Sequence, residues 1–228
     1  MKAKEKPPVK KKVLLVDDHP VMRQGLGQLI DQEPDLMVCG EAEDQHSALA
    51  AIEKTKPDIA VVDISLKNSS GIELMKDIHI RWPKLPALVL SMHDESFYAE
   101  RVLRAGARGY VTKAEAPAKL IAAIRQVLAG GLHVSEKLAA QMIGKMVNPG
   151  GRGGDGPGLL IDRLSDREFE VFELIGQGID LHDIAQRLHL SVKTIEAHRE
   201  NIKKKLSMES SIDLLKYAIQ WNQFERGT

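Results

Sequence analysis

A short apolar run that ends on a carboxylate limits most strongly what this chain can fold into. Residues Ile59 to Val62 are continuously apolar, Pro57 lies just before them, and a polar loop that ends at Gly71 follows. A run of this length between turn-forming residues is typical of a strand buried on both faces of a parallel sheet. Asp63 stands at the carboxyl end of that strand, where open parallel sheets gather their chemistry. Taken alone, such an aspartate is more often a turn former or a helix cap.

The remainder of the first 130 residues alternates strand-like and helix-like segments. Apolar runs near 13–16, 36–40, 59–62, 87–90 and 109–111 predict strands, and a segment with helical spacing follows each of them. Five such alternations predict a parallel α/β sheet. Because the carboxyl ends of parallel strands share one edge, the side chains that follow them are expected to form one site. Four of the five strands end on a side chain suited to chemistry: Asp17 and Asp18, Asp63, Ser91, and Lys113.

Residues 13 to about 130 resemble the receiver domain of two-component response regulators, and we place this domain at residues 12–131. The resemblance implies a flavodoxin-like sheet with strand order 2-1-3-4-5, whose first and third strands bring the three aspartates side by side. The residues that carry it are the acidic pair Asp17-Asp18, the acceptor-type Asp63, the hydroxyl of Ser91, the aromatic Tyr110, and Lys113.

Three neighbouring carboxylates repel one another, and a hard divalent cation removes that conflict. Mg²⁺ is therefore the expected cofactor. The resemblance implies that Asp18, Asp63 and the backbone carbonyl of Ser65 bind the ion directly, while Asp17 acts through water. It also implies that Asp63 is the nucleophile that accepts a phosphoryl group.

Other side chains have expected roles around that phosphoryl group. Lys113 supplies a positive charge and Ser91 a hydroxyl donor, which suits a reaction that needs positioning and charge neutralisation more than an acid or a base. The resemblance also implies a switch, in which Ser91 moves toward phosphorylated Asp63 and Tyr110 changes rotamer. The alternative for Tyr110 is a half-buried strand aromatic. His19 is interpreted as a loop or cap residue.

A glycine-rich segment separates the two halves of the chain, and we assign residues 132–160 to the linker. Residues 135–147 have the spacing of one further amphipathic helix, and residues 148–158 read Asn-Pro-Gly-Gly-Arg-Gly-Gly-Asp-Gly-Pro-Gly. No strand precedes these glycines and no GxxxxGK[ST] spacing is present. They are therefore interpreted as a flexible tether and not as a phosphate-binding loop.

The second half, residues 161–228, has helical patterning throughout. Ser165-Asp-Arg-Glu168 has the form of a capping box that opens a helix. A short helix, a tight turn at 189–190 and a helix capped by Ser191 together predict a helix-turn-helix. An all-α domain is expected, with four helices near 165–176, 180–188, 191–206 and 210–224.

This half resembles the LuxR/FixJ/NarL type of DNA-binding domain over its full length. The resemblance implies that the helix beginning at Ser191 contacts DNA. The matching residues are Leu164-Ser165, Arg167-Glu168, Glu170-Val171, Gly178, Ile184-Ala185, Leu188, Ser191, Lys193-Thr194-Ile195, His198, Asn201-Ile202 and Lys205-Leu206.

Charge supports DNA binding only through its distribution. Residues 159–228 hold ten lysines or arginines and twelve aspartates or glutamates, so the formal net charge is −2, which excludes a general polycation effect. Glu196 and Ala197 are expected to face base edges, and the alternative for Glu196 is a partner within its own helix. The remaining DNA face, mostly phosphate-contacting, is assigned to Lys193, Thr194, His198, Arg199 and Lys203.

Together these features predict a DNA-binding response regulator and not an enzyme. A sensor histidine kinase is expected to phosphorylate Asp63, which frees a masked DNA-binding helix so that the chain dimerises on promoter DNA. RNA polymerase is a further candidate partner. The alternative is a phosphorylation-independent DNA-binding protein whose receiver is only a dimerisation scaffold. A phosphatase of the haloacid dehalogenase type is set aside because Ser65 occupies the place of its second aspartate.

Composition says more about the cellular compartment of the protein than about its function. The 32 basic and 32 acidic residues balance, and the single cysteine, Cys39, excludes an intramolecular disulfide and fits a reducing compartment. No apolar run approaches the ~20 residues that a membrane span needs, and no apolar segment of signal-peptide length follows the N-terminal lysines. A cytoplasmic bacterial protein without a membrane partner is expected.

Overall fold

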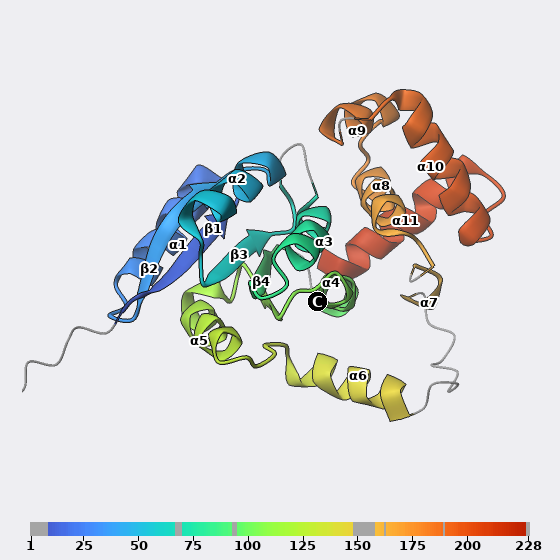
Figure 1. The fold of residues 1–228 in the computed structure, drawn as a ribbon. Coiled ribbons are helices and arrows are strands. Elements are labelled where there is room, and N and C mark those ends of the chain that lie inside the picture. The colour runs from blue at the N-terminus through green and yellow to red at the C-terminus, as the bar shows by residue number, and fades with distance from the viewer. Residues whose placement is uncertain are drawn as a thin grey trace, which may run out of the picture. The chain divides into compact units, whose positions relative to one another are not determined.

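The computed structural model describes residues 9–66, 70–92, 95–147, 158–161, 163–188 and 190–226. The chain divides into two compact units between Leu138 and Ala139, and each is considered by itself (Figure 1). Most of the expected tether, residues 148–157, lies outside the described residues, as does His189 of the expected turn.

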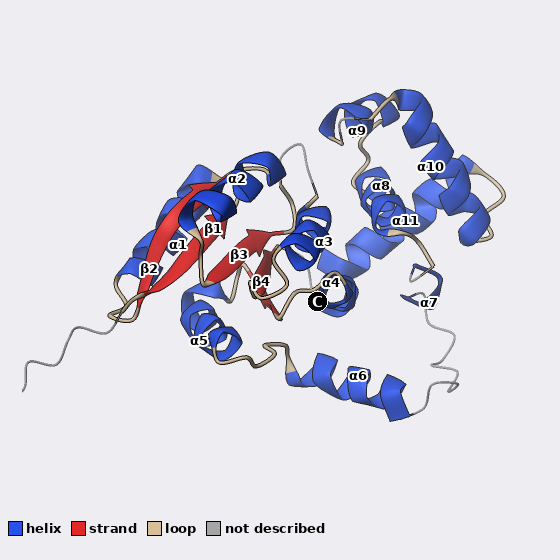
Figure 2. Ribbon diagram, in the orientation of Figure 1, coloured by secondary structure: helices blue, strands red, loops and turns tan. Residues whose placement is uncertain are grey.

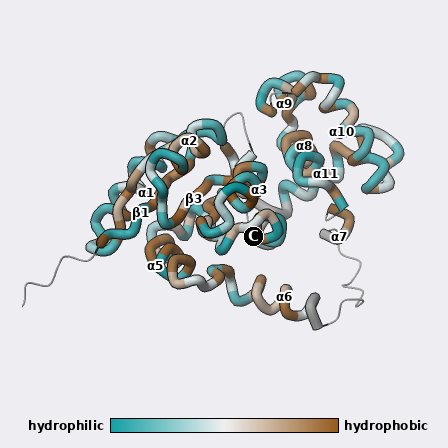
Figure 3. Tube along the Cα trace, viewed as in Figure 1, coloured by the Kyte–Doolittle hydropathy of each residue, from teal (hydrophilic) through white to brown (hydrophobic). Residues whose placement is uncertain are grey.

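A five-stranded parallel sheet forms the centre of the first unit, and its strand order β2-β1-β3-β4-β5 confirms the expected one. All four pairs of neighbouring strands are parallel. Every residue of β3 and β4 is buried, because helices cover both faces of the sheet. Figure 3 shows the apolar character of β3. The strands are β1 (Lys11–Val16), β2 (Leu36–Ala42), β3 (Ile59–Asp63), β4 (Ala87–Ser91) and β5 (Gly109–Thr112).

Two layers of helices enclose this sheet (Figure 2). Helices α1 and α5 contact each other on one face, and α2, α3 and α4 follow one another across the other face. Pro20 begins α1, where its missing N–H costs little. Asp44 caps α2 through a capping box with Ser47. The helices are α1 (Pro20–Asp31), α2 (Gln45–Thr55), α3 (Gly71–Arg81), α4 (Glu95–Arg104) and α5 (Ala116–Leu128).

The core under α1 and α5 holds the sheet in register. Leu15, Val61 and Leu90 project from three adjacent strands and are at most 2% exposed. They pack against Ile30 of α1 and Leu120 of α5, neither of which contacts solvent. Burial of each such side chain stabilises the fold by about 1.5–3 kcal/mol. This packed core therefore fixes the positions of the carboxyl ends of the strands.

All described elements of the second unit are helices. The four expected helices are present as α8 (Asp166–Gly176), α9 (Leu181–Arg187), α10 (Val192–Lys205) and α11 (Ser211–Arg226). A four-residue helix, α7 (Gly158–Ile161), was not expected, and α6 (Glu136–Val147) begins in the first unit and continues into the second. Within the described residues no helix is long and apolar enough to cross a membrane.

An aromatic cluster joins α8 to α11. The ring of Trp221 lies 5.4 Å from that of Phe169 and 5.6 Å from that of Phe172, both edge-on. Such pairs add about 0.5–1.5 kcal/mol beyond the burial of their area. Trp221 is 5% exposed, so it is a core residue of this unit.

Hydrogen bonds at the helix starts confirm the caps predicted at Ser165 and Ser191 and show a further cap at Asp180. Ser165 and Glu168 form the complete capping box that opens α8. Asp180 accepts from two backbone amides at the start of α9, and Ser191 accepts from Thr194 N at the start of α10. Each cap contributes about 1 kcal/mol. Together they define where the two helices of the helix-turn-helix begin.

Candidate functional site

The sheet brings its strand-ending side chains to one edge. Val16 pairs with Val62 across β1 and β3, so Asp17 and Asp63 come at equivalent places in the next row. Ser91 pairs with Thr112 across β4 and β5, which brings Lys113 beside the end of β4. The structure therefore gathers the residues that the sequence predicted to share a site.

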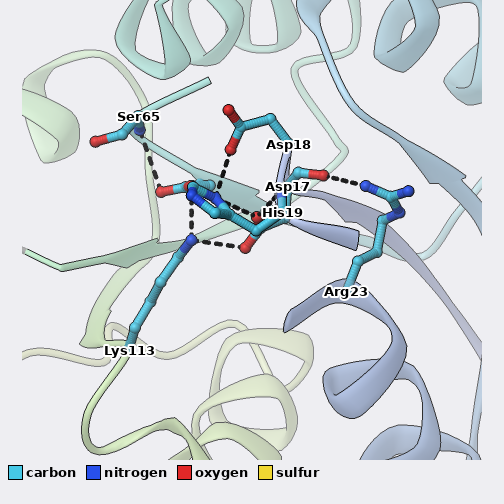
Figure 4. A network of polar contacts seen from close by, with 7 residues as sticks. Asp17, Asp18, His19, Arg23, Ser65 and Lys113 are labelled. Carbon is cyan, nitrogen blue, oxygen red and sulfur yellow. Dashed lines mark hydrogen bonds and ion pairs between the residues drawn. The ribbon is translucent and has the colours of Figure 1, made fainter. Parts of the chain in front are cut away.

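Lys113 joins two of the three aspartates (Figure 4). Its Nζ lies 2.7 Å from Oδ2 of Asp63 and 2.7 Å from Oδ2 of Asp17. All three side chains are at most 3% exposed. The backbone N–H of Lys113 donates to the carbonyl of Ser91 at 2.6 Å, which ties the lysine to the end of β4.

The charges in this cluster do not balance. Burial raises the pKa of the Asp63 carboxyl; the Lys113 ammonium opposes that shift and the neighbouring charge of Asp17 adds to it. Burial acts to lower the pKa of Lys113, but the two carboxylates outweigh it and the pKa is raised. With Asp18 included, three carboxylates and one ammonium have a formal charge of −3 + 1 = −2. The site is thus electrostatically suited to a divalent cation.

His19 lies against the acidic pair, although the sequence suggested only a loop or cap role. It occupies the cap position of α1 without a side-chain cap bond. Its Nδ1 lies 2.6 Å from Oδ1 of Asp18, and its backbone N–H donates to Oδ1 of Asp17 at 2.8 Å. Arg23 donates to the backbone carbonyl of Asp17. No sequence motif signals either contact, since both follow from the way α1 leaves the strand.

The loop after β3 returns closely to Asp63. The N–H of Ser65 donates to Oδ1 of Asp63 at 3.1 Å, and Gly71 N–H donates to the carbonyl of Ile64 at 2.9 Å. A Cβ at Gly71 would lie 2.3 Å from the carbonyl oxygen of Asp63. Only glycine allows this approach, so Gly71 positions the site although sequence reasoning treated it as part of a turn.

The donor atoms fit the expected metal. Ligand atoms from Asp17, Asp18, His19 and Asp63 all lie within 4.8 Å of one another. Carboxylate oxygens are the ligands that Mg²⁺ takes from proteins, usually one or two of them together with water. The cluster is therefore consistent with a metal site, and the imidazole was not among the predicted ligands.

The two residues of the predicted switch are both buried. Ser91 has no exposed surface, and Tyr110 is 3% exposed. Tyr110 is therefore more deeply buried than the half-buried strand aromatic of the alternative interpretation. Its backbone N–H donates to the carbonyl of His133 at 2.8 Å. Sequence analysis had placed His133 in the linker, and this contact attaches it to β5.

An apolar cavity of about 640 Å³ opens beside the site. Lys113 and His19 lie at its polar end. Among the lining residues, Val21 and Met92 are 85% and 72% exposed. The remaining lining residues are Met22, Gly25, Leu26, Leu29, Ala116 and Pro117.

The helix α10 presents one face inward and the other to solvent. Ile195 and Ile202 are fully buried, so the positions between them turn outward. Of the seven residues predicted to face DNA, Lys193, Glu196 and Ala197 are exposed, and the other four (Thr194, His198, Arg199 and Lys203) are partly exposed.

The charged side chains of α10 differ in the ion pairs that they form. Lys203 pairs with Glu200 at 3.1 Å, and Lys205 pairs with Glu168 of α8 at 2.5 Å. Arg199 lies 3.9 Å from Glu200. Within the described part of the chain Glu196 is exposed and forms no ion pair.

Two protein families match the two units. The response regulator receiver domain matches residues 13–125, and the luxR family of bacterial regulatory proteins matches residues 162–218. The oxygen regulatory proteins NreC of Staphylococcus carnosus (strain TM300) and Staphylococcus haemolyticus (strain JCSC1435) are 32% and 33% identical to this chain. Each comparison extends over 210 residues and covers 92% of this chain and 97% of the relative.

Solved structures give the same result. RcsB from Salmonella enterica serovar Typhimurium, bound to promoter P1flhDC in the presence of the phosphomimetic BeF₃⁻, is 29% identical with a TM-score of 0.64. That comparison covers 92% of this chain and 98% of RcsB. A LuxR-family two-component response regulator from Aurantimonas sp. SI85-9A1 is 37% identical with a TM-score of 0.56, over 60% of this chain and 99% of its own. The chain therefore belongs to the NarL/FixJ family of two-component response regulators, transcription regulators in which a receiver domain precedes a LuxR-type DNA-binding domain.

Proposed function

We propose that Asp63 accepts a phosphoryl group from a sensor histidine kinase and that this event controls dimerisation of the chain on promoter DNA. The observation that carries the proposal is the buried cluster at the end of β3, where Lys113 lies 2.7 Å from both Asp63 and Asp17. A structural ion pair needs one carboxylate for one ammonium. The excess of carboxylates suits a site built to receive a cation and a phosphoryl group.

Each residue of the cluster has a defined part in the transfer. Asp18, Asp63 and the Ser65 carbonyl would hold Mg²⁺, with Asp17 acting through water, and the ion would supply positive charge to the phosphoryl oxygens. An oxygen of Asp63 attacks phosphorus, and the bond from phosphorus to the donor imidazole nitrogen breaks, with its electron pair leaving on nitrogen. Lys113 then binds a phosphoryl oxygen, for which its Nζ already lies within reach.

The apolar cavity beside the site is the proposed docking surface for the kinase. A phosphohistidine donor has to approach Asp63 closely, so the kinase has to cover surface next to Lys113 and His19, which line one end of the cavity. Exposed Val21 and Met92 supply the apolar contacts there. The cavity is lined mainly by α1 and the start of α5, together with Met92 after β4 and Lys113 after β5.

Ser91 and Tyr110 are proposed to transmit the change. Ser91 belongs to the strand next to Asp63, and its hydroxyl gains a strong acceptor when Asp63 is phosphorylated. Tyr110 is paired with Val89 on the neighbouring strand, so a shift at the end of β4 changes the space around it. The phosphoryl group acts only through the difference in its interactions with the two arrangements.

On the DNA side, α10 is proposed as the recognition helix. Lys193, Thr194, His198, Arg199 and Lys203 face phosphates, and Glu196 and Ala197 face base edges. RcsB has been solved on promoter DNA, and we extend that mode of action to this chain, with a homodimer reading paired half-sites. Because its DNA target lies there, the proposed place of action is the bacterial cytoplasm.

The test compares wild type with Asp63→Ala, each with and without acetyl phosphate and Mg²⁺. Size-exclusion chromatography measures dimerisation, and a gel shift measures DNA binding. Donor-dependent dimerisation and tighter DNA binding in wild type alone are expected. Equal binding in all four samples contradicts the proposal and favours a DNA-binding protein whose receiver is only a scaffold.

A further inference from the structure

The chain does not leave the receiver unit at the end of α5. Residues 132–138, here called the strap, return along the edge strand β5. Tyr110 N–H donates to the carbonyl of His133 at 2.8 Å, and His133 N–H donates to the carbonyl of Arg108 at 3.0 Å. His133 thus forms a parallel bridge with Gly109. A Cβ on Gly109 would lie 2.8 Å from the His133 carbonyl oxygen, so this close approach depends on glycine.

Side chains attach the strap to two helices as well. Gln126 of α5 donates from Nε2 to the carbonyl of Leu132 at 2.8 Å, and its Oε1 lies 2.8 Å from Nδ1 of His133. Leu138, at the far end of the strap, is only 4% exposed. On the other side, the N–H of Ser135 donates to Oε1 of Glu95, the first residue of α4, at 2.8 Å.

We propose that the strap carries the state of Asp63 to the DNA-binding unit and that the hydrogen bond between Glu95 and Ser135 is its releasable contact. This inference rests on the function proposed above and names the path by which the switch leaves the receiver. The strap contacts α4 through Glu95, and it contacts β5 through the backbone of the switch residue Tyr110.

The Glu95 contact is the one most easily broken. Glu95 stands four residues after Ser91, so movement of Ser91 toward a phosphorylated Asp63 displaces the start of α4. A hydrogen bond of 2.8 Å is lost once its N···O distance passes about 3.5 Å, so a displacement below 1 Å is sufficient. The bonds of His133 to β5 and of Gln126 to the strap do not involve α4 and remain as a hinge.

Loss of the Glu95 contact acts directly on α6. Ser135 immediately precedes α6, and its Oγ accepts from the N–H of Leu138 at 3.1 Å, as a cap does. When Ser135 is no longer held by α4, the start of α6 can rotate about the bonds at His133. Because α6 begins in the receiver unit and continues into the second unit, this rotation changes how the DNA-binding unit is tethered.

Amide hydrogen exchange in the full-length chain, resolved by residue, tests the inference. Acetyl phosphate with Mg²⁺ is expected to speed exchange of the Ser135 amide in wild type by at least about tenfold, with a smaller change at His133. Glu95→Ala is expected to give the fast exchange without donor and to tighten DNA binding severalfold. Glu95→Gln, which keeps an oxygen acceptor, is expected to behave as wild type.

Glu100→Ala is the matched control, because Glu100 lies on the same helix and pairs with Arg104. It is expected to leave Ser135 exchange and DNA affinity unchanged. If wild type is phosphorylated on Asp63 and the Ser135 amide still exchanges slowly, the inference about the strap is wrong. A different result separates the two proposals. If the donor leaves dimerisation and DNA binding of wild type unchanged while Glu95→Ala still tightens DNA binding, the role of the Glu95 contact is supported and the proposed function is wrong.

Discussion

The Nζ atom of Lys113 lies 2.7 Å from Oδ2 of Asp63, and both side chains are at most 3% exposed. In a buried pair of this kind, one ammonium normally neutralises one carboxylate. Here the same ammonium also pairs with Asp17 at 2.7 Å, so each carboxylate receives only part of its charge. Burial and this sharing keep the pKa of Asp63 above its usual value, and the ionised form therefore costs folding free energy.

Asp63→Asn is expected to raise the free energy of unfolding at pH 7 without Mg²⁺, by on the order of 1 kcal/mol. The amide has nearly the same shape and removes one charge from a crowded site, while Lys113 keeps Asp17 as its partner. Urea unfolding followed by circular dichroism measures the change. A loss of stability in Asp63→Asn contradicts the electrostatic account.

The pH dependence of this gain has a definite sign. An acid whose pKa is raised on folding binds its proton more tightly in the native state, so its ionisation destabilises the fold at pH values above the folded pKa. The advantage of Asp63→Asn is expected to shrink as the pH falls through that pKa toward the ordinary value of 3.8. Urea midpoints from pH 7 down to pH 4 give the trend.

Asp58→Asn provides the contrast. Burial acts to raise the pKa of Asp58, but its bonds with the Lys12 N–H and the Lys11 ammonium outweigh burial and lower it. An acid whose pKa is lowered on folding contributes stability at pH values above its unfolded pKa, and that stability is lost as the pH falls through the folded pKa. Asp58→Asn is therefore expected to destabilise the protein at pH 7.

Mg²⁺ is expected to stabilise wild type through Asp18. At a concentration ten times its Kd, an ion that binds only the native state adds about 1.4 kcal/mol. Asp18→Ala is expected to lose this increment, whereas Glu53→Ala, which removes an exposed carboxylate from α2, retains it. Urea unfolding across an Mg²⁺ titration distinguishes them. Equal stabilisation of wild type and Asp18→Ala contradicts the assignment of this ligand.

Val21→Asp is expected to slow phosphotransfer from the cognate kinase at least tenfold while phosphorylation by acetyl phosphate remains at the wild-type rate. Val21 is 85% exposed and lines the cavity beside Lys113, and a carboxylate there opposes apolar docking. Ile80→Asp changes an apolar side chain on α3 that is 75% exposed; it is the control and is expected to have no effect. Both rates are read on phosphate-affinity gels.

Lys193→Ala and Glu196→Ala are expected to change DNA binding in different ways. Lys193 is exposed at the start of α10; its loss is expected to weaken binding to all DNA sequences and to reduce the salt slope by about 0.9 per chain. Loss of Glu196 is expected to reduce the preference for the correct base at the position it contacts, by about 1–3 kcal/mol of binding free energy. Lys216→Ala on α11 is the control for charge alone. Fluorescence anisotropy with operator and scrambled DNA separates these effects.

Much of the first unit was predictable because strand signals are local. The apolar runs identified β3 and β4 almost to the residue, since these strands are buried throughout and are therefore continuously apolar. The edge strand β2 was less well bounded: it extends to Ala42, two residues beyond the apolar run. Its partly exposed residues carry no strong pattern, and only pairing with β1 extends it.

Sequence alone determined which side chains lie at the carboxyl ends of the strands, because strand direction and polarity are properties of the chain itself. Family resemblance added the strand order. The tertiary structure decided how those side chains meet: Lys113 reaches Asp63 across 50 positions of sequence, His19 turns onto Asp18, and the strap closes on Tyr110 and Glu95. Such contacts depend on the three-dimensional approach of distant segments, and no local pattern of residues records that approach.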